Sequence, residues 1–190
     1  MSTVKTYQTE DNYLATCGGA LYVPQVSVVV ALTITDSNGN VVSRMEKTND
    51  NFLSNALKLF LAVVGGHSGL SGVTTAGATT SLPTTFATAP TTSIVIGSGT
   101  QTLSATISNL VSTYTSFAAL ISSLAVVNTT STQVILSGSI SVTSAVTISE
   151  VGLLAVTPVG AFLLTYDTFA GQSTGTSGGT ITVTITITFS

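Results

Sequence analysis

The chain has 190 residues, a length that suits one domain, and only 6% of them are charged, against about 25% in an average protein. Only four residues are basic (Lys5, Arg44, Lys47 and Lys58), so neither binding to a nucleic-acid backbone nor a polybasic membrane patch is expected. No apolar run approaches the roughly 20 residues of a membrane span, and the single cysteine, Cys17, cannot form an internal disulfide.

The first part of the chain predicts an arm followed by a β-hairpin. Residues 1–20 are polar and irregular, and they lack the basic and apolar pattern of a signal peptide. β-Branched residues dominate "VSVVVALTIT" (26–35), which predicts a strand. The turn "DSNGN" (36–40) contains Asn-Gly, a strong hairpin signal, so "VVSRMEK" (41–47) is predicted to return as the paired strand.

A helix is predicted next, over about 51–64. Apolar residues recur there at spacings of three and four, which indicates one apolar face that packs on a sheet or plugs an end of a sandwich. A cap is expected at Thr48, Asn49 or Asp50, and Gly65-Gly66 ends the helix. The predicted buried face consists of Phe52, Leu53, Ala56, Leu57, Phe60, Leu61 and Val64.

The rest of the chain predicts short strands separated by Gly-rich turns. Residues 65–92 form a Gly/Ser/Thr-rich segment, expected to be a loop or short edge strands, and "SIVIGSG" (93–99) is a buried strand and a turn. Residues 101–127 fit either a helical stripe or an irregular, strand-rich crossing, and the second is favoured because Ser and Thr are frequent. Two strands are expected around Gly138, and another at "GAFLLTYDTFA" (160–170).

The closing segment "TITVTITITF" (180–189) places isoleucine and valine on one face and threonine on the other. As a free edge such a strand would aggregate, so both of its edges must be paired. It lies either in its own sheet, as a meander with "EVGLL" and "AFLLTY", or in a neighbouring copy; we favour the first. In total, about eight strands and one helix predict a mainly β, antiparallel β-sandwich or jelly roll spanning residues 21–190.

Residues able to carry chemistry are few. Cys17 fits a small buried hydrophobe, His67 a solvated loop residue, and Asp36 a hairpin turn instead of a calcium loop, because the later acidic ligands are missing. Glu150 and Asp167 interrupt uncharged strands; they either cap backbone donors or face each other across a sheet, and we expect structural roles. No catalytic, cofactor-binding or metal residue is assigned, no cofactor is expected, and an enzyme is disfavoured. Asn128 begins an N-glycosylation sequon that chance readily produces in a Thr-rich chain.

Three segments carry a resemblance to a known class. They are the hairpin and helix "VALTITDSNGNVVSRMEKTNDNFLSNALKLFLAVV", the strand and turn "SIVIGSGTQTLSATISNLVS", and the ending "VTISEVGLLAVTPVGAFLLTYDTFAGQSTGTSGGTITVTITITF". Together they resemble small virion structural proteins of tailed phages and archaeal viruses. Tyr166 stands where that pattern has Arg, and the acidic residue after Gly179 is absent. The resemblance implies a β-sandwich subunit of a virus particle with no catalytic residues, and the sparse charge resembles proteins from hot acidic habitats.

The function expected is therefore that of a self-assembling virion structural protein: a capsid, vertex, decoration or tail component of an archaeal or thermophilic virus. Its partners are copies of itself and other virion proteins, with no nucleic acid and no membrane span. Two alternatives stay open: an extracellular filament or pilus subunit joined by strand exchange, and a spike domain that binds a host surface receptor. An aromatic cleft would be the sign of a glycan-binding spike.

Overall fold

The structure, a computed structural model, describes residues 26–49, 53–63, 66, 68–85, 91–102, 104, 106–118, 120–128, 131–174 and 178–189. The predicted arm at 1–20, with Cys17, and the loop residue His67 lie outside the described residues.

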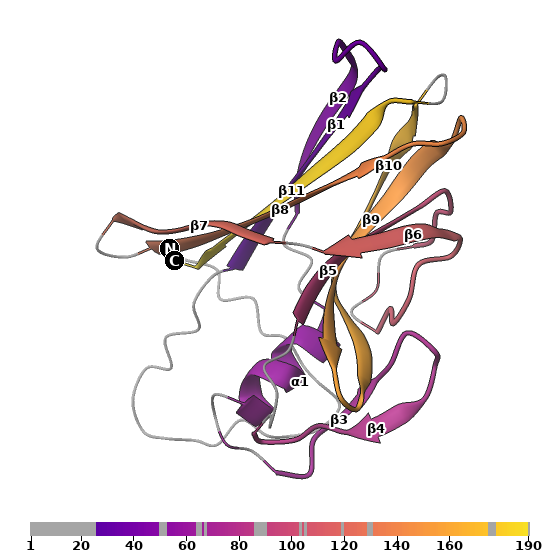
Figure 1. Ribbon diagram of the computed structural model, residues 1–190. Coiled ribbons are helices and arrows are strands. Elements are labelled where there is room, and N and C mark those ends of the chain that lie inside the picture. Colours follow the sequence, from indigo (N-terminus) through magenta and orange to yellow (C-terminus); the bar gives the residue numbers. More distant parts are fainter. Residues whose placement is uncertain are drawn as a thin grey trace.

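Two antiparallel sheets pack face to face, which confirms the predicted mainly β sandwich (Figure 1). The larger sheet consists, in spatial order, of β2 (Val41–Asn49), β1 (Val26–Thr35), β11 (Thr180–Phe189), β8 (Ser131–Ser141) and β7 (Leu120–Asn128). The smaller sheet consists of β10 (Gly160–Ser173), β9 (Thr147–Thr157), β5 (Thr91–Gly97) and β6 (Thr113–Ala118). Aliphatic side chains of both sheets form the core between them, including Val28, Leu32, Ile94, Ile96, Val151, Leu153, Ile181 and Ile185.

The hairpin of β1 and β2 forms as predicted. The backbone N–H of Asp36 donates to Asn40 O at 2.9 Å, and Gly39 adopts a φ of 83°, a conformation that glycine takes without strain. The carboxylate of Asp36 accepts the backbone N–H groups of Asn38 and Asn40 at 2.8 and 2.9 Å. These bonds, and one from the Asn40 side chain, lower the pKa of Asp36. Asp36 is therefore a turn residue.

The closing strand β11 lies inside its own sheet, between β1 and β8. Its isoleucine and valine row is buried, with Ile181, Val183 and Ile185 at 0% exposure. The favoured intramolecular placement is therefore what the structure shows, but the predicted meander with β9 and β10 is wrong. After β10 the chain crosses to the other sheet, where Val142 N–H donates to Gly179 O at 2.8 Å and Gly178 N–H to Val142 O at 2.7 Å.

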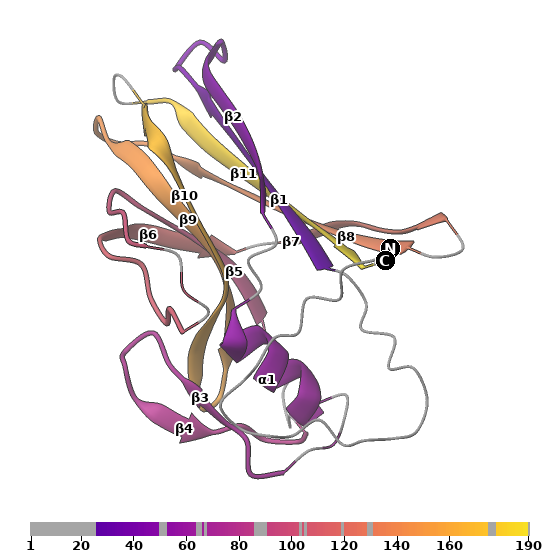
Figure 2. The ribbon, with the colours of Figure 1, turned by 180° about the vertical axis from the view of Figure 1, so that it is seen from behind.

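The helix α1 spans Ser54–Val63 and covers the end of the sandwich where β9 and β10 meet (Figures 1 and 2). Two of the three predicted caps are wrong, because Thr48 and Asn49 belong to β2; the third, Asp50, lies outside the described residues. The buried face also differs from the prediction. Leu53, Ala56 and Ala62 are buried, whereas the exposed side chains include Leu57 (47%), Phe60 (54%) and Leu61 (36%).

Asn55 explains how the helix is turned. Its side-chain amide is buried, and it donates to Val73 O at 2.7 Å and accepts Val73 N–H at 3.1 Å. Val73 belongs to β3 (Ser71–Val73), which pairs with β4 (Thr79–Ser81) inside the segment predicted as loop or short edge strands. Because this buried polar contact faces inward, part of the apolar stripe faces outward.

The remaining differences concern strand number. The described residues form eleven strands instead of about eight, since β3 and β4 add a hairpin and residues 101–127 supply β6 and β7. The strand-rich crossing is thus confirmed over the helical alternative. Gly138 lies within β8, opposite Val183, and not between two strands.

Candidate functional site

The most connected polar side chain among the described residues is the carboxylate of Glu150 on β9, which is 0% exposed. Its Oε1 accepts backbone N–H bonds from Gly99 at 3.0 Å and Ser112 at 2.8 Å. Its Oε2 accepts the Val111 N–H at 3.1 Å and the Tyr166 hydroxyl at 2.9 Å. We call Glu150 and these four partners the Glu150 cluster.

Two glycines allow the cluster to close. A Cβ on Gly97 would lie 2.4 Å from Ser112 O and 2.6 Å from Glu150 Oε1, and one on Gly99 would lie 2.4 Å from the Val111 Cβ. Real side chains do not tolerate such contacts, so the "GSG" sequence is required for close approach as well as for a turn. Ser98 N–H also donates to Ser112 O at 3.0 Å, which joins the two ends of the segment 98–112.

Tyr166 completes the cluster from β10. Burial, together with the hydrogen bond to Glu150, raises the pKa of its phenol to about 12. The phenol therefore stays protonated and acts as a donor. Since each carboxylate oxygen of Glu150 already accepts two hydrogen bonds, the cluster holds backbone in place and offers no free acceptor to a substrate.

Asp167 lies on the opposite face of the smaller sheet from Glu150. It pairs in register with Val151, a residue of the core between the sheets, and it is 0% exposed. Neither of its oxygens accepts a hydrogen bond from a described residue. Burial raises the pKa of Asp167 to about 6, and the positive charge of Lys47 opposes that rise. A buried carboxylate without a donor is costly, so this site weakens the fold when ionised.

Lys47 reaches this region from the other sheet. It pairs with the core residue Val30, so it lies on the inner face of β2, and its ammonium donates to Thr168 O of β10. Nearby, the Ser43 hydroxyl donates to Gln172 Oε1, again from β2 to β10. These bonds join the two sheets along one side of the sandwich.

The carboxylates of Glu150 on β9 and Asp167 on β10 thus lie in separate surroundings. Glu150 caps backbone donors, which confirms one of the alternatives weighed from the sequence, and the alternative that it faces Asp167 is wrong. Neither residue lies at a strand end. The sequence pointed to Glu150 through its isolation in an uncharged strand, but nothing in the sequence pointed to Tyr166, Gly97 and Gly99 as its neighbours.

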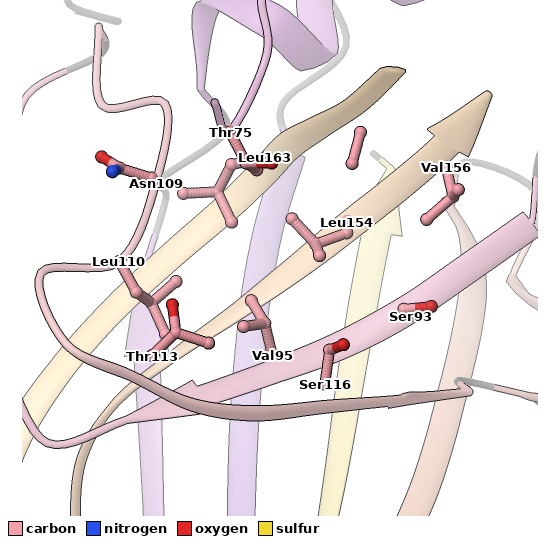
Figure 3. A pocket seen from close by; sticks show the side chains of 11 residues that line it. Thr75, Ser93, Val95, Asn109, Leu110, Thr113, Ser116, Leu154, Val156 and Leu163 are labelled. Atoms are coloured by element: carbon pink, nitrogen blue, oxygen red, sulfur yellow. The ribbon is translucent and has the colours of Figure 1, made fainter. Parts of the chain in front are cut away.

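A shallow groove of about 390 Å³ crosses the outer face of the smaller sheet. Val95, Leu154 and Leu163 lie together in it, with Asn109 and Leu110 beside them (Figure 3). Threonine, serine and small apolar side chains make up the rest of the lining, which contains no aromatic ring and no ionisable group. The groove therefore lacks the stacking surface that a sugar-binding cleft uses.

Other candidate residues add no site. Within the described ranges, no three His, Cys, Asp or Glu side chains gather as metal ligands. Likewise, α1, the helix that the structure describes, is too short to cross a membrane. Asn128 ends β7, and its side chain is not described.

Comparison of the chain with protein-family models, curated proteins and solved structures finds no match. The geometry does show how two of the segments quoted above for their likeness to virion proteins are related. Gly99, Val111 and Ser112 belong to "SIVIGSGTQTLSATISNLVS", and Glu150 and Tyr166 belong to the ending. The two segments meet in the Glu150 cluster, so their joint presence has a structural reason.

Proposed function

We propose that this protein is a virion structural protein, a self-assembling β-sandwich subunit of a capsid, vertex, decoration or tail, from an archaeal or thermophilic virus. The virion assignment rests on the resemblance of three segments to such proteins. The assembly role rests on the surface of the fold.

The observation that carries the assembly role is the outward apolar face of α1. Leu57 is 47% exposed and Phe60 54%, and Leu61 and Val63 are 36% and 39% exposed. Apolar side chains gathered on one short helix mark a surface that another protein covers. With 6% charged residues in the whole chain, little ionic repulsion opposes contact between copies.

The polar groups support the same proposal. Glu150 uses its carboxylate to hold the segment 98–112, and Asp36 uses its carboxylate in a turn. Both carboxylates hold backbone segments in place, which suits a subunit whose task is to present a fixed surface to its neighbours.

Two other functions are weighed against this one. A filament or pilus subunit is favoured by the uncharged edge strand β7, whose sequence is "LISSLAVVN". A receptor-binding spike gains less support, because the groove on the smaller sheet has no aromatic lining.

Mass spectrometry of purified virus particles, combined with negative-stain electron microscopy, tests the proposal. We expect the chain in many copies in particles that contain a genome. A helical polymer of the purified chain without any genome would favour the filament. A protein that is absent from particles and stays monomeric at high concentration would contradict both.

A further inference from the structure

A sandwich with two sheets has four edge strands, and in this fold they are β2 and β7 in the larger sheet and β10 and β6 in the smaller one. Each edge presents backbone N–H and C=O groups that can pair with another chain. The four edges are protected to different degrees.

The edges of β2 and β10 are protected. β2 carries Arg44, Glu46 and Lys47, which are two of the 4 basic residues and one of the 7 acidic residues in the entire chain. Charged residues on an edge discourage pairing, because a partner strand would have to desolvate them. On β10, carbonyl groups accept bonds from other parts of the chain: Ala161 from Thr75 N–H, Leu164 from Leu53 N–H, and Thr168 from Lys47.

Within the described part of the chain, the edge of β7 shows neither protection. The strand is nine residues long, contains no charge, proline or glycine, and pairs with β8 alone among the described strands. Figures 1 and 2 show the hairpin of β7 and β8 extending sideways beyond the smaller sheet, so that sheet does not cover it. A segment with this composition matches those that add to other strands when exposed. β6, the fourth edge strand, has six residues against nine in β7, so it offers a partner fewer backbone groups.

We propose that β7 of one copy pairs antiparallel with β7 of a second copy, so that two larger sheets join into one continuous sheet. An unpaired backbone edge is satisfied by another extended strand, which sets the chemistry of the partner. A second β7 supplies such a strand without charge, and a two-fold arrangement satisfies both edges in one closed contact. This inference rests on the proposed self-assembly and adds the β7 edge as a second contact surface in addition to the outward face of α1.

A matched pair of lysine substitutions tests the pairing. Ser123→Lys places a lysine near the middle of β7, where two copies would bring like charges together. Thr48→Lys adds the same positive charge at an exposed position on the charged edge β2. In sedimentation velocity over a concentration series, Ser123→Lys should weaken dimer formation by about tenfold or more, while Thr48→Lys leaves it unchanged. Equal effects of the two substitutions, or a wild type that never dimerises, would overturn the pairing.

Cysteine cross-linking decides the matter if Ser123→Lys fails to fold. In a Cys17→Ser background, single cysteines at positions 123, 124 and 125 should give a disulfide-linked dimer at one or two neighbouring positions, whereas Thr48→Cys should give none. A dimer that no β7 cysteine traps would use another surface. With Cys17 retained, a cross-link between it and β7 would assign the edge to residues 1–25 and overturn the pairing. If the chain is found in virus particles whose subunits do not pair through β7, the β7 pairing is overturned but the virion proposal is not.

Discussion

On one side of the sandwich, β2 and β10 are joined across the gap between the sheets by Lys47 and Ser43. On the other side, β6 and β7 follow one another along the chain from Thr113 to Asn128, and that stretch contains no charged residue. The first side is closed by the chain's own side chains. The second has a backbone edge that no described strand covers. If copies assemble as proposed, the charged β2 edge is the one that would resist contact, and the uncharged β7 edge the one that would accept it.

The second side is nevertheless held from within. The segment 98–112, which leads into β6, is bonded to Glu150 through three backbone N–H groups. An edge can pair with a partner in a defined register only if its own position is fixed. The Glu150 cluster therefore fixes the segment that leads into β6, whereas Lys47 joins β2 to β10 on the other side.

The largest effect is expected from Glu150→Ala. It removes the acceptor of three backbone N–H groups and of the buried Tyr166 hydroxyl, so the free energy of unfolding should fall by about 3–5 kcal/mol. Urea denaturation measures the change, with Glu46→Ala on the exposed face of β2 as the control, expected within about 0.5 kcal/mol. A loss below about 1 kcal/mol would show that the cluster does not hold this side.

A somewhat smaller effect is expected from Gly97→Ala. The added methyl group would lie 2.4 Å from Ser112 O, so the segment must shift away from β5, at a cost of about 2–3 kcal/mol. Urea denaturation again measures the change in the free energy of unfolding. The neighbouring Ser98→Ala removes a long, exposed hydroxyl contact of 3.3 Å and should change stability by less than about 0.5 kcal/mol. If both variants behave alike, the close approach at Gly97 is unimportant.

The β2 and β10 side should respond to pH. Because the pKa of Asp167 is raised from 3.8 to about 6, the folded protein binds its proton more tightly than the unfolded chain does. This contribution is present at low pH and is lost as the pH rises through about 4 to 6, by about 3 kcal/mol in total.

Asp167→Asn isolates that contribution. The variant should lack this decline and be more stable than the wild type at pH 7 by about 1–3 kcal/mol. The measurement is the difference in unfolding free energy between the two proteins at several pH values, which cancels the other titrating groups. A difference independent of pH would mean that Asp167 does not titrate in this range.

The smallest effect on stability is expected from Phe60→Ser on α1. The side chain is 54% exposed, so the free energy of unfolding should change by about 0.5 kcal/mol or less, while assembly of the purified protein, measured by light scattering, should decrease. Leu53→Ser is the contrasting variant, since Leu53 is 2% exposed and its loss should cost about 2–4 kcal/mol. Unchanged assembly in Phe60→Ser would remove α1 from the contact surface.

Local signals in the sequence predicted much of the fold. The Asn-Gly turn, the alternation in β11 and the helix before Gly65 each depend on neighbouring residues, and each is present, apart from the exact bounds. The sequence could not show which face of α1 is buried. Asn55 decides that through a hydrogen bond to Val73, a residue in another element.

Long-range choices were the least predictable. The pairing of β11 with β1 and β8 depends on the crossing near Gly179, where a Cβ would lie 2.1 Å from Thr35 O. Local alternation fits either sheet equally well, so the meander prediction had no means of distinguishing them. In the candidate site, the isolated Glu150 was visible in the sequence, but its three backbone donors lie 38 to 51 residues away and became visible only in the fold.

The placement of β11 also constrains how the protein acquires its shape. Thr35 and its partner Thr180 are 145 residues apart in sequence. During synthesis the β1–β2 hairpin therefore leaves the ribosome long before β11, the strand that pairs with β1, has been made. One edge of β8 likewise stays unpaired until β11 is made. Closing so distant a contact is slow, so we expect the nascent chain to depend on chaperones until β11 inserts.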